Sequence, residues 1–314
     1  MAARKSYALD QSPLYKLSSR KRLANDIFNV ELAYLESLAA NTNNYRVFQI
    51  KQGQKLRQVE APKVVLERIH RRLFALLERI AKPDYLHSGV RGRSYISNAK
   101  VHTGCVPLVK LDLKKFYPSV DGARVYRFFS DTLLCSSDVS GLLTRLCTFQ
   151  NHVPTGSCTS QLLAFFAAKP LFDELNILAI KAGVHGTVYV DDLTWSGEGA
   201  TPAFLWRAKQ VVHRHGFIHH KDRCFAAQDK KLVTGVLLDG NRIAVLPSRE
   251  HEIWKNIQAL GNFDPTERLV AINSLIGSAV AASQVDARFL QRLRRLHRLK
   301  ATTITEIGMA SGHS

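Results

Sequence analysis

The stretch GTVYVDDLTWSG, residues Gly186–Gly197, places the adjacent aspartates Asp191 and Asp192 between two short apolar runs that favour β-structure. This pattern predicts a strand, a two-residue turn and a second strand, with both carboxylates at the tip. Adjacent carboxylates repel each other, so the pair costs free energy unless a cation such as a divalent metal ion neutralises it. The alternative is a surface turn with two solvated carboxylates, because a Tyr-x-Asp-Asp match occurs by chance in roughly a few per cent of chains of this length.

A third carboxylate, Asp112, lies in the apolar run CVPLVKLDL, residues Cys105–Leu113, which predicts another strand. If the strands are neighbours in one sheet, Asp112 meets Asp191 and Asp192. Three carboxylates from two strands can hold two Mg²⁺ ions, for which Mn²⁺ can substitute. Such a pair would activate a 3′-hydroxyl and stabilise a leaving pyrophosphate, which is nucleotidyl transfer. Taken alone, Asp112 would instead be interpreted as a buried strand residue paired with Lys114.

The composition favours a folded protein with a polyanionic partner. The chain has 314 residues, with 44 Lys and Arg against 26 Asp and Glu, a formal net charge of +18, 46% hydrophobic residues and 22% charged residues. The hydrophobic content excludes a disordered polycation, and the charge indicates nucleic acid as the leading partner. No run approaches the roughly 18 apolar residues of a membrane span, and the first residues lack the apolar core of a signal peptide. Five cysteines without a CxxC pair indicate reduced thiols in a cytosol.

Helical and extended patterns follow each other irregularly along the chain. Helical periodicity covers residues 20–40, 63–81, 122–148 and 159–182. Strand-like runs cover Tyr45–Lys51, Lys55–Glu60, Cys105–Leu113, Gly186–Val190, Leu193–Ser196, Lys231–Leu238 and Asn241–Val245. Hairpins are predicted around residues 52–54 and at Asp239–Gly240. Because regular βαβ alternation is missing, the sequence predicts an α+β fold, and we expect the tail after Lys300 to be frayed.

Positive charge is concentrated at residues 1–22 and 284–300. The second segment, QVDARFLQRLRRLHRLK, spaces its apolar residues along one face of a helix and places Arg292 and Arg295 among the cations of the other face. Two interpretations stay open for this helix: a solvated amphipathic helix that closes the domain, or the lining of a nucleic-acid groove. The net charge of the chain favours the groove.

The order of the short motifs resembles that of retron-type bacterial reverse transcriptases. Asp112 with FYPS at 116–119, TGSCTS at 155–160 and Tyr-x-Asp-Asp at 189–192 are similar to three successive polymerase motifs. The segment Asn98-Ala-Lys-Val-His102 and the triplet Val233-Thr234-Gly235 match two further motifs of the family. Each motif is a weak signal alone, but five motifs in the family's order are a strong one.

This resemblance implies a right-hand polymerase fold with fingers, a palm made of an antiparallel sheet flanked by helices, and a short helical thumb. The implied divisions are a basic N-terminal helical extension at 1–40, fingers at 41–104, a palm at 105–238 with the fingers helices of 122–182 interleaved, and a thumb at 239–314 that contains the basic helix 284–300.

The activity implied by the resemblance is RNA-directed DNA polymerisation. A structured noncoding RNA would be both template and primer, and part of it would be copied from dNTPs into single-stranded DNA as an RNA–DNA hybrid product. Priming from an RNA 2′-hydroxyl would give a branched RNA–DNA molecule. The resemblance also implies a role in antiphage defence with a separate effector protein, in the bacterial cytoplasm.

Roles for individual residues follow from the matching positions. The resemblance implies that Asp112, Asp191 and Asp192 are catalytic and bind the metal ions. It implies nucleotide contacts for Lys55, Arg57, Tyr117, Gly156 and Lys221. It implies contacts with the cognate RNA for Asn98, His102, Val233, Thr234, Gly235, Arg292 and Arg295. The ring of Tyr117 would exclude a nucleotide that carries a 2′-hydroxyl.

Several of these positions have competing interpretations. Lys51 is an alternative to the two hairpin cations, and Arg223 is an alternative to Lys221 near the pyrophosphate. The hairpin cations could instead line a solvated edge, Tyr117 could be ordinary core packing, and Lys221 could lie in a basic loop. Thr155 stands where the family has a glutamine, so it is assigned no chemistry, and His220 stands where the family has asparagine.

Other functions are compatible with parts of the sequence. The first is a group II intron-like or other defence-associated reverse transcriptase, although the chain is short for accessory maturase or endonuclease regions. The second is a non-catalytic RNA-binding palm scaffold, against which the presence of all three aspartates argues. The third is a nucleotide cyclase, which would need a Gly-Gly-acidic-Glu-Phe turn in place of Tyr-Val-Asp-Asp. No membrane partner is expected, and the sequence leaves the oligomeric state open.

Overall fold

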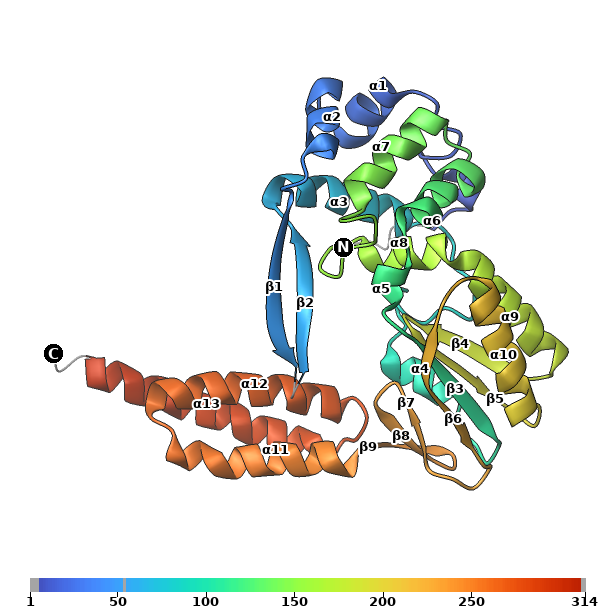
Figure 1. Ribbon diagram of the computed structural model, residues 1–314. Coiled ribbons are helices and arrows are strands. Elements are labelled where there is room, and N and C mark those ends of the chain that lie inside the picture. The colour runs from blue at the N-terminus through green and yellow to red at the C-terminus, as the bar shows by residue number, and fades with distance from the viewer. Residues whose placement is uncertain (1–5, 53–54, 312–314) are drawn as a thin grey trace. The chain divides into compact units, whose positions relative to one another are not determined.

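The computed structural model describes residues 6–52 and 55–311 and contains both helices and antiparallel strands (Figure 1). The predicted α+β class is confirmed. The described residues form two compact units: the first runs to Arg93 and resumes over Val109–Cys224, and the second comprises Ser94–Leu108 and the chain from Phe225 onward. The division into N-terminal extension, fingers, palm and thumb stays a prediction.

A four-stranded sheet forms the centre of the first unit, in the order β4-β5-β3-β6. Its strands are β3 (Leu108–Leu113), β4 (His185–Tyr189), β5 (Asp192–Ser196) and β6 (His219–Phe225). The helices α9 (Lys169–Lys181) and α10 (Pro202–Arg214) lie together beside it (Figure 1). Strand β6 falls in a polar, basic stretch for which the sequence favoured no strand. Pairing with β3 outweighs the weak strand propensity of this stretch.

The predicted long helices of the first unit are broken into shorter ones. The run 20–40 contains α1 (Arg20–Arg22), the π-helical η2 (Leu23–Phe28) and α2 (Leu32–Ala40), and the run 122–148 contains α6 (Gly122–Arg127), the π-helical η3 (Phe128–Thr132) and α7 (Ser137–Cys147). The run 159–182 contains α8 (Ser160–Ala167) and α9. The breaks at Asn29 and Leu134 have positive φ values of 53° and 54°. Hydrophobic periodicity cannot reveal such breaks, because the apolar face continues across them.

The remaining helices of this unit are η1 (Leu9–Gln11), α3 (Val64–Leu77) and α5 (Phe116–Ser119). One apolar core joins them to the sheet, and aromatic pairs lie inside it: the rings of Phe128 and Phe166 stack with centroids 5.3 Å apart. Leu14 and Leu23 of the N-terminal segment belong to the same core and are fully buried. The described part of this segment therefore packs as part of the unit.

The strands β1 (Tyr45–Gln52) and β2 (Lys55–Pro62) form a separate antiparallel hairpin, in which Gln52 pairs with Lys55. The hairpin predicted around residues 52–54 is confirmed by this register, and its turn residues 53–54 lie outside the described residues. Figure 1 shows the hairpin as a two-stranded ribbon that extends away from α3. Its apolar side chains Phe48, Ile50 and Leu56 are exposed, so contacts at its base hold the ribbon in place.

The second unit combines α4 (Tyr95–Val101), a three-stranded sheet and the C-terminal helices. The sheet consists of β7 (Lys231–Val233), β8 (Val236–Asp239) and β9 (Arg242–Val245). The predicted Asp-Gly hairpin is confirmed by the pairing of Asp239 with Arg242. The single strand predicted over Lys231–Leu238 is wrong, because a turn at Thr234–Gly235 divides it.

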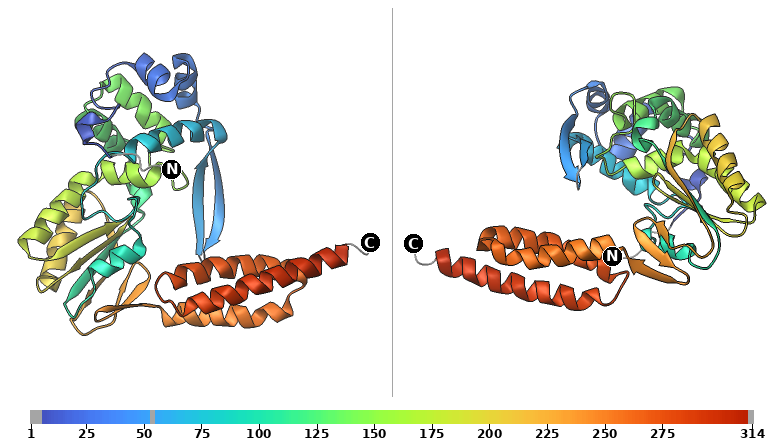
Figure 2. Two further views of the ribbon diagram at one scale, coloured as in Figure 1. Left: turned by 180° about the vertical axis from the view of Figure 1, so that it is seen from behind. Right: turned by 60° about the horizontal axis from the view of Figure 1, so that its bottom comes forward.

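The C-terminal helices are α11 (Pro247–Ala259), the short 3₁₀ turn η4 (Leu260–Asn262), α12 (Pro265–Ser283) and α13 (Phe289–Ser311). The views of Figure 2 show α11, α12 and α13 side by side. The predicted basic helix exists but begins at Phe289, and the expectation of a frayed tail after Lys300 is wrong for the described residues, in which the helix continues to Ser311. Helix α13 continues because its apolar face packs against α12, through Leu296 and Ile272 among others, and Thr303 is still buried.

Candidate active site

The two adjacent aspartates lie at the predicted hairpin between β4 and β5, but its two-residue turn begins one residue earlier than predicted. Tyr189 pairs with Asp192, so Val190 and Asp191 form the turn and Asp192 is the first residue of β5. Val190 has a φ of +59°, a strained conformation for a β-branched residue. Its backbone N–H donates to Ser88 Oγ at 2.9 Å, and Val188 accepts from the N–H of His87 at 2.9 Å. The segment before α4 therefore holds the turn in its strained conformation.

Asp112 lies on β3, the neighbour of β5 in the sheet. Side chains alternate along β3, so Leu111 and Leu113 are buried on one face while Lys110 and Asp112 are half-buried on the other. The N–H of Leu113 donates to the backbone oxygen of Asp191 at 2.9 Å. The structure thus brings Asp112 to the two adjacent aspartates, which are 79 and 80 positions away along the chain.

The pKa values of Asp191 and Asp192 are raised by burial and by the neighbouring negative charges. Burial, followed by the charges of Asp112 and Asp192, raises the pKa of Asp191 to about 6. Burial also raises the pKa of Asp192, against the opposing effect of the nearby Lys110. The charge of Arg57 on β2 opposes the rise in the pKa of Asp191. The guanidinium of Arg57 therefore lies within electrostatic range of the turn. The negative charges are therefore coupled and only partly balanced by cations.

Two residues of β6 lie next to Asp112. His220 Nδ1 is 3.2 Å from Asp112 Oδ1, and Lys221 Nζ is 3.9 Å from Asp112 Oδ2. The first contact is within ion-pair distance, but its angles do not make a hydrogen bond, and both atoms are buried without one. The sequence indicated His220 only as a departure from the family's asparagine and did not predict that it lies beside Asp112. Lys110 was not predicted to be near the aspartates. The alternation of side chains on β3 is the signal that could have found Lys110.

The donor set of the three aspartates fits a hard divalent cation such as Mg²⁺, because carboxylate oxygens are its preferred ligands and Asp112 Oδ1 is buried without a hydrogen bond. Within residues 6–52 and 55–311, no group of three His, Cys, Asp or Glu side chains is already arranged around a single metal position. The carboxylate ligands therefore fit a divalent cation, but the side chains of the three aspartates would have to move to bind one ion together.

Of the predicted nucleotide-contacting residues of the first unit, Arg57, Tyr117 and Lys221 interact electrostatically with the aspartates. Burial, then Asp191 and Tyr189, raise the pKa of Tyr117 to about 12, so its hydroxyl lies within electrostatic range of the Val190–Asp191 turn. Lys55 opens β2, and its side chain lies outside the described part of the structure. Gly156 lies against β2: a Cβ atom added to it would be 2.8 Å from Val59 Cγ1 and 2.9 Å from the oxygen of Glu60. Only glycine allows this approach.

The two family motifs predicted to contact RNA form one cluster in the second unit. Asn98 and His102 are buried on α4, and Val233 is buried in the same small core as Ile96 and Ala99. Both polar side-chain atoms of Asn98 are buried without a hydrogen bond among the described residues. The side chains of Asn98, His102 and Val233 are therefore covered by protein, whereas Lys100 and Val101 between them are exposed.

Thr234 and Gly235 form the turn between β7 and β8, with φ values of +45° and +81°. The hydroxyl of Thr234 donates to the backbone oxygen of Tyr95 at 2.8 Å. Lys231, which is also buried, donates to the backbone oxygens of Gly104 and Ala227 at 3.1 and 2.9 Å. Helix α4 and the β7–β8 turn, which carry the two motifs, are therefore joined by the Thr234–Tyr95 hydrogen bond and by a shared apolar core.

The predicted RNA-binding arginines of α13 differ in their surroundings. Arg292 donates to Glu250 of α11 at 2.8 Å and lies over the ring of Phe289 at 4.6 Å. Arg295 is exposed, as are Arg294 and Arg298.

Among the described residues no helix is long and apolar enough to cross a membrane.

Comparisons with known proteins support the resemblance to retron reverse transcriptases. The retron Se72 reverse transcriptase of Salmonella heidelberg is 36% identical over 162 residues, which cover 49% of this chain and 42% of that protein. The retron Mx162 reverse transcriptase of Myxococcus xanthus is 29% identical over 298 residues, which cover 75% of this chain and 61% of that protein. The chain thus spans roughly half the length of these relatives. No family model matches the chain.

Among solved structures, apo telomerase from Candida tropicalis is similar with a TM-score of 0.48 and 9% identity, over 69% of this chain and 61% of that one. Because this score is below 0.5, the likeness adds no argument about function. The similarity to several retron reverse transcriptases confirms the resemblance that the motifs indicated.

Proposed function

We propose that this chain, which is similar to retron reverse transcriptases, is an RNA-directed DNA polymerase of the retron type. The observation that carries the proposal is the meeting of Asp112 with Asp191 and Asp192 on one sheet, with their charges coupled. A half-buried cluster of like charges is unfavourable for folding, and groups with such perturbed pKa values are concentrated at functional sites.

Asp112, Asp191 and Asp192 would hold two Mg²⁺ ions, and Mn²⁺ would serve as a substitute. When bound, the ions would supply activation of the attacking hydroxyl and charge stabilisation at the phosphates. The unbonded oxygen of Asp112 and the raised pKa of Asp191 support this assignment, because both are relieved when a cation neutralises the cluster.

The other side chains would bind and orient the nucleotide. Arg57 would contact the triphosphate, since its guanidinium can bind phosphate oxygens in a bidentate manner. Lys55 would assist it as a point charge. The ring of Tyr117 would lie under the sugar and exclude a 2′-hydroxyl, and Gly156 would let the backbone approach the nucleotide. Lys221, next to Asp112, would lie near the leaving pyrophosphate.

The finer parts of the proposal rest on the similarity to retron enzymes. We propose that the substrate is a structured noncoding RNA that serves as both template and primer, and that an RNA 2′-hydroxyl starts synthesis to give a branched RNA–DNA. We also propose antiphage defence with a separate effector protein, in the bacterial cytoplasm. The charge of +18 supports a nucleic-acid partner.

The test is to express the chain with its native flanking DNA and to search the extracted nucleic acid for a small RNA-linked single-stranded DNA. The product should be present for the wild-type chain and absent for the Asp191→Asn/Asp192→Asn double variant. With purified protein, EDTA should abolish primer extension on an RNA template, and Mg²⁺ or Mn²⁺ should restore it. A product that persists in the double variant would contradict the catalytic assignment.

Two other outcomes would select the alternatives. Primer extension without a branched product would favour a group II intron-like or other defence-associated reverse transcriptase. RNA binding without any extension would favour a non-catalytic palm scaffold.

A further inference from the structure

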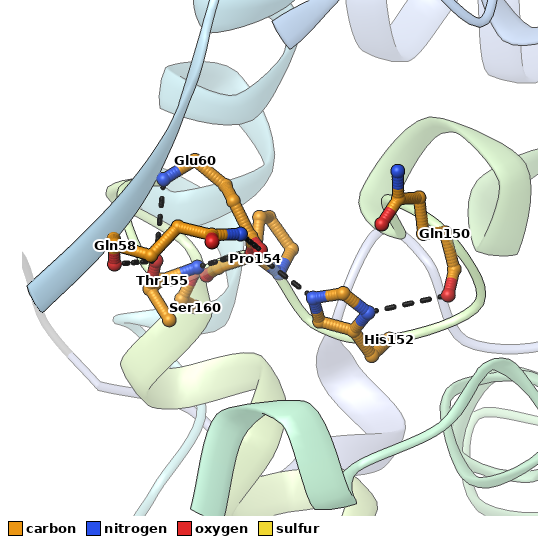
Figure 3. Close-up of polar contacts among 7 residues, drawn as sticks. All are labelled: Gln58, Glu60, Gln150, His152, Pro154, Thr155 and Ser160. Carbon is orange, nitrogen blue, oxygen red and sulfur yellow. Dashed lines mark hydrogen bonds and ion pairs between the residues drawn. The ribbon is translucent and has the colours of Figure 1, made fainter. Parts of the chain in front are cut away.

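Glu60 on β2 is a buried carboxylate outside the group of three aspartates. It is only 4% exposed and has a different set of partners. Its Oε1 accepts from Gln58 Nε2 at 3.0 Å. Its Oε2 accepts from the backbone N–H of Thr155 at 3.3 Å and lies 3.0 Å from His152 Nε2. Figure 3 shows these side chains at the junction between the β1–β2 hairpin and the loop before α8.

Thr155 joins the same junction through its side chain. Its hydroxyl donates to the backbone oxygen of Gln58 at 3.0 Å and accepts from the backbone N–H of Glu60 at 3.2 Å (Figure 3). The N–H of the next residue, Gly156, donates to the backbone oxygen of Glu60 at 3.2 Å. Thr155 and Gly156 therefore form hydrogen bonds with backbone atoms on one edge of β2, and β1 pairs with its other edge.

The loop is itself attached to the core on its other side. Ser157 Oγ is 2.7 Å from His70 Nδ1, and His70 Nε2 is 2.7 Å from the backbone oxygen of Leu146. Ser160 donates to the backbone oxygen of Pro154 at 2.5 Å. Because His70 is fully buried on α3, the loop has a fixed position against the core, and β2 is bonded to that fixed loop.

The consequence of this arrangement concerns Arg57, which directly precedes Gln58 in β2. The outer part of the hairpin is exposed and makes few contacts of its own, so the bonds at its base determine where it points. Arg57 is close enough to Asp191 for its positive charge to oppose the rise in the pKa of that carboxyl group. A change in the direction of β2 would move this guanidinium relative to the catalytic turn.

We propose that Glu60, His152 and Thr155 form a clip that positions the β1–β2 hairpin, and with it Arg57, for binding of the nucleotide triphosphate. The inference rests on the proposed polymerase function and names these three as positioning residues. Thr155 stands where the family has a glutamine. The proposed role of Thr155 is to hold β2 through hydrogen bonds from its backbone N–H and its hydroxyl.

The chemistry of the clip makes its carboxylate difficult to replace. An ionised carboxylate has about four acceptor sites, enough for the donors of Gln58, Thr155 and His152. A glutamine of the same shape carries no charge and has an NH2 group in place of one oxygen, so it has fewer acceptor sites for these donors than the carboxylate. Valine has the shape of threonine but neither accepts from Glu60 nor donates to Gln58.

The experiment measures single-nucleotide addition to a DNA primer on a homopolymer RNA template, with the full chain. Thr155→Val and Glu60→Gln should each raise the KM for the dNTP about fivefold or more and change kcat by less than about twofold. Thr155→Ser, which keeps the hydroxyl, should restore the wild-type KM. If the clip acts through Arg57, Glu60→Gln should add little to the KM of Arg57→Ala, because residues that act through one another are not additive.

The matched control is Val139→Ala, a core substitution on α7 that lowers thermal stability and leaves both the clip and the catalytic turn unchanged. Its KM for the dNTP should equal that of the wild type. An unchanged KM in Thr155→Val and Glu60→Gln, in an active enzyme, would overturn the inference and leave the clip a purely structural feature. A wild-type chain that extends no primer would instead contradict the proposed function itself.

Discussion

Single residues decide how the candidate site treats its substrate, and Tyr117 is the clearest example. Burial, followed by the charge of Asp191, raises the pKa of its hydroxyl, so Tyr117 lies within electrostatic range of the Val190–Asp191 turn as well as packing beside Phe116. A ring at this position would occupy the space that a 2′-hydroxyl needs.

Replacing Tyr117 with alanine should therefore weaken the selection of deoxynucleotides. We expect the ratio of kcat/KM for dGTP to that for GTP to fall about tenfold or more, which corresponds to roughly 1.4 kcal/mol or more of lost discrimination. Tyr117→Phe keeps the ring and should retain the wild-type ratio. An unchanged ratio in the alanine variant would assign Tyr117 to core packing.

His70 should make the stability of the protein depend on pH. Burial lowers the pKa of His70 to about 4, while the same group titrates near 6.5 in the unfolded chain. Between these values the unfolded state binds more protons, so the free energy of unfolding should fall as the pH falls from about 6.5 to about 4, by up to about 3 kcal/mol.

Urea unfolding at pH 7.5 and pH 5 measures this change. His70→Gln removes the titrating group, so the difference in unfolding free energy between the two pH values should shrink. His297→Gln, at an exposed position of α13, should leave the difference as in the wild type. An equally large difference in His70→Gln would show that other groups cause the acid sensitivity.

At the scale of elements, the turn between β7 and β8 explains the physical requirements of the Val-Thr-Gly triplet. Val233 is buried, Gly235 provides the positive φ, and Thr234 accepts a strained left-handed conformation. The bond from the Thr234 hydroxyl to Tyr95 offsets that strain and ties the turn to α4.

Thr234→Val should destabilise this turn by about 1–2 kcal/mol, because it keeps the strain and loses the hydrogen bond. Thr234→Gly loses the bond but also relieves the strain, so its effect should be smaller. Hydrogen exchange of the backbone amides in residues 231–239 measures the local stability. Equal protection in Thr234→Val and the wild type would contradict this account.

At the scale of the whole molecule, the net charge of +18 concerns nucleic-acid binding. Cations that neutralise phosphates release bound counterions, so affinity for RNA falls as salt rises. The structure divides the arginines of α13 into two groups. Arg295 is exposed, whereas Arg292 is paired with Glu250 and lies over Phe289.

We therefore expect Arg295→Ala to weaken RNA binding and to reduce the slope of log affinity against log salt by about 1. Arg292→Ala should act mainly on stability, because it leaves Glu250 without its partner and removes contacts between α11 and α13. Filter binding between 50 and 200 mM salt, together with thermal unfolding, separates the two effects. Equal slopes for the wild type and Arg295→Ala would exclude that arginine from the RNA interface.

Some features of this protein could be predicted from its sequence because they depend on neighbouring residues. The hairpin at Asp191 and Asp192, the strand with Asp112, the hairpin around residues 52–54 and the Asp-Gly turn all have local patterns, and all are present. The breaks at Asn29 and Leu134 and the strand β6 depend on packing and pairing with distant residues, so hydrophobic periodicity could not reveal them.

The sequence by itself determined the candidate site of this protein: three aspartates in a basic chain, with motifs that resemble, in order, those of reverse transcriptases. Residue type and spacing carry that information because carboxylates bind divalent ions wherever the fold brings them together. Only the tertiary structure decided which residues surround them. His220 lies beside Asp112, and Glu60 and Thr155 join the hairpin to its loop, because these partners are distant in sequence and meet only when the chain folds.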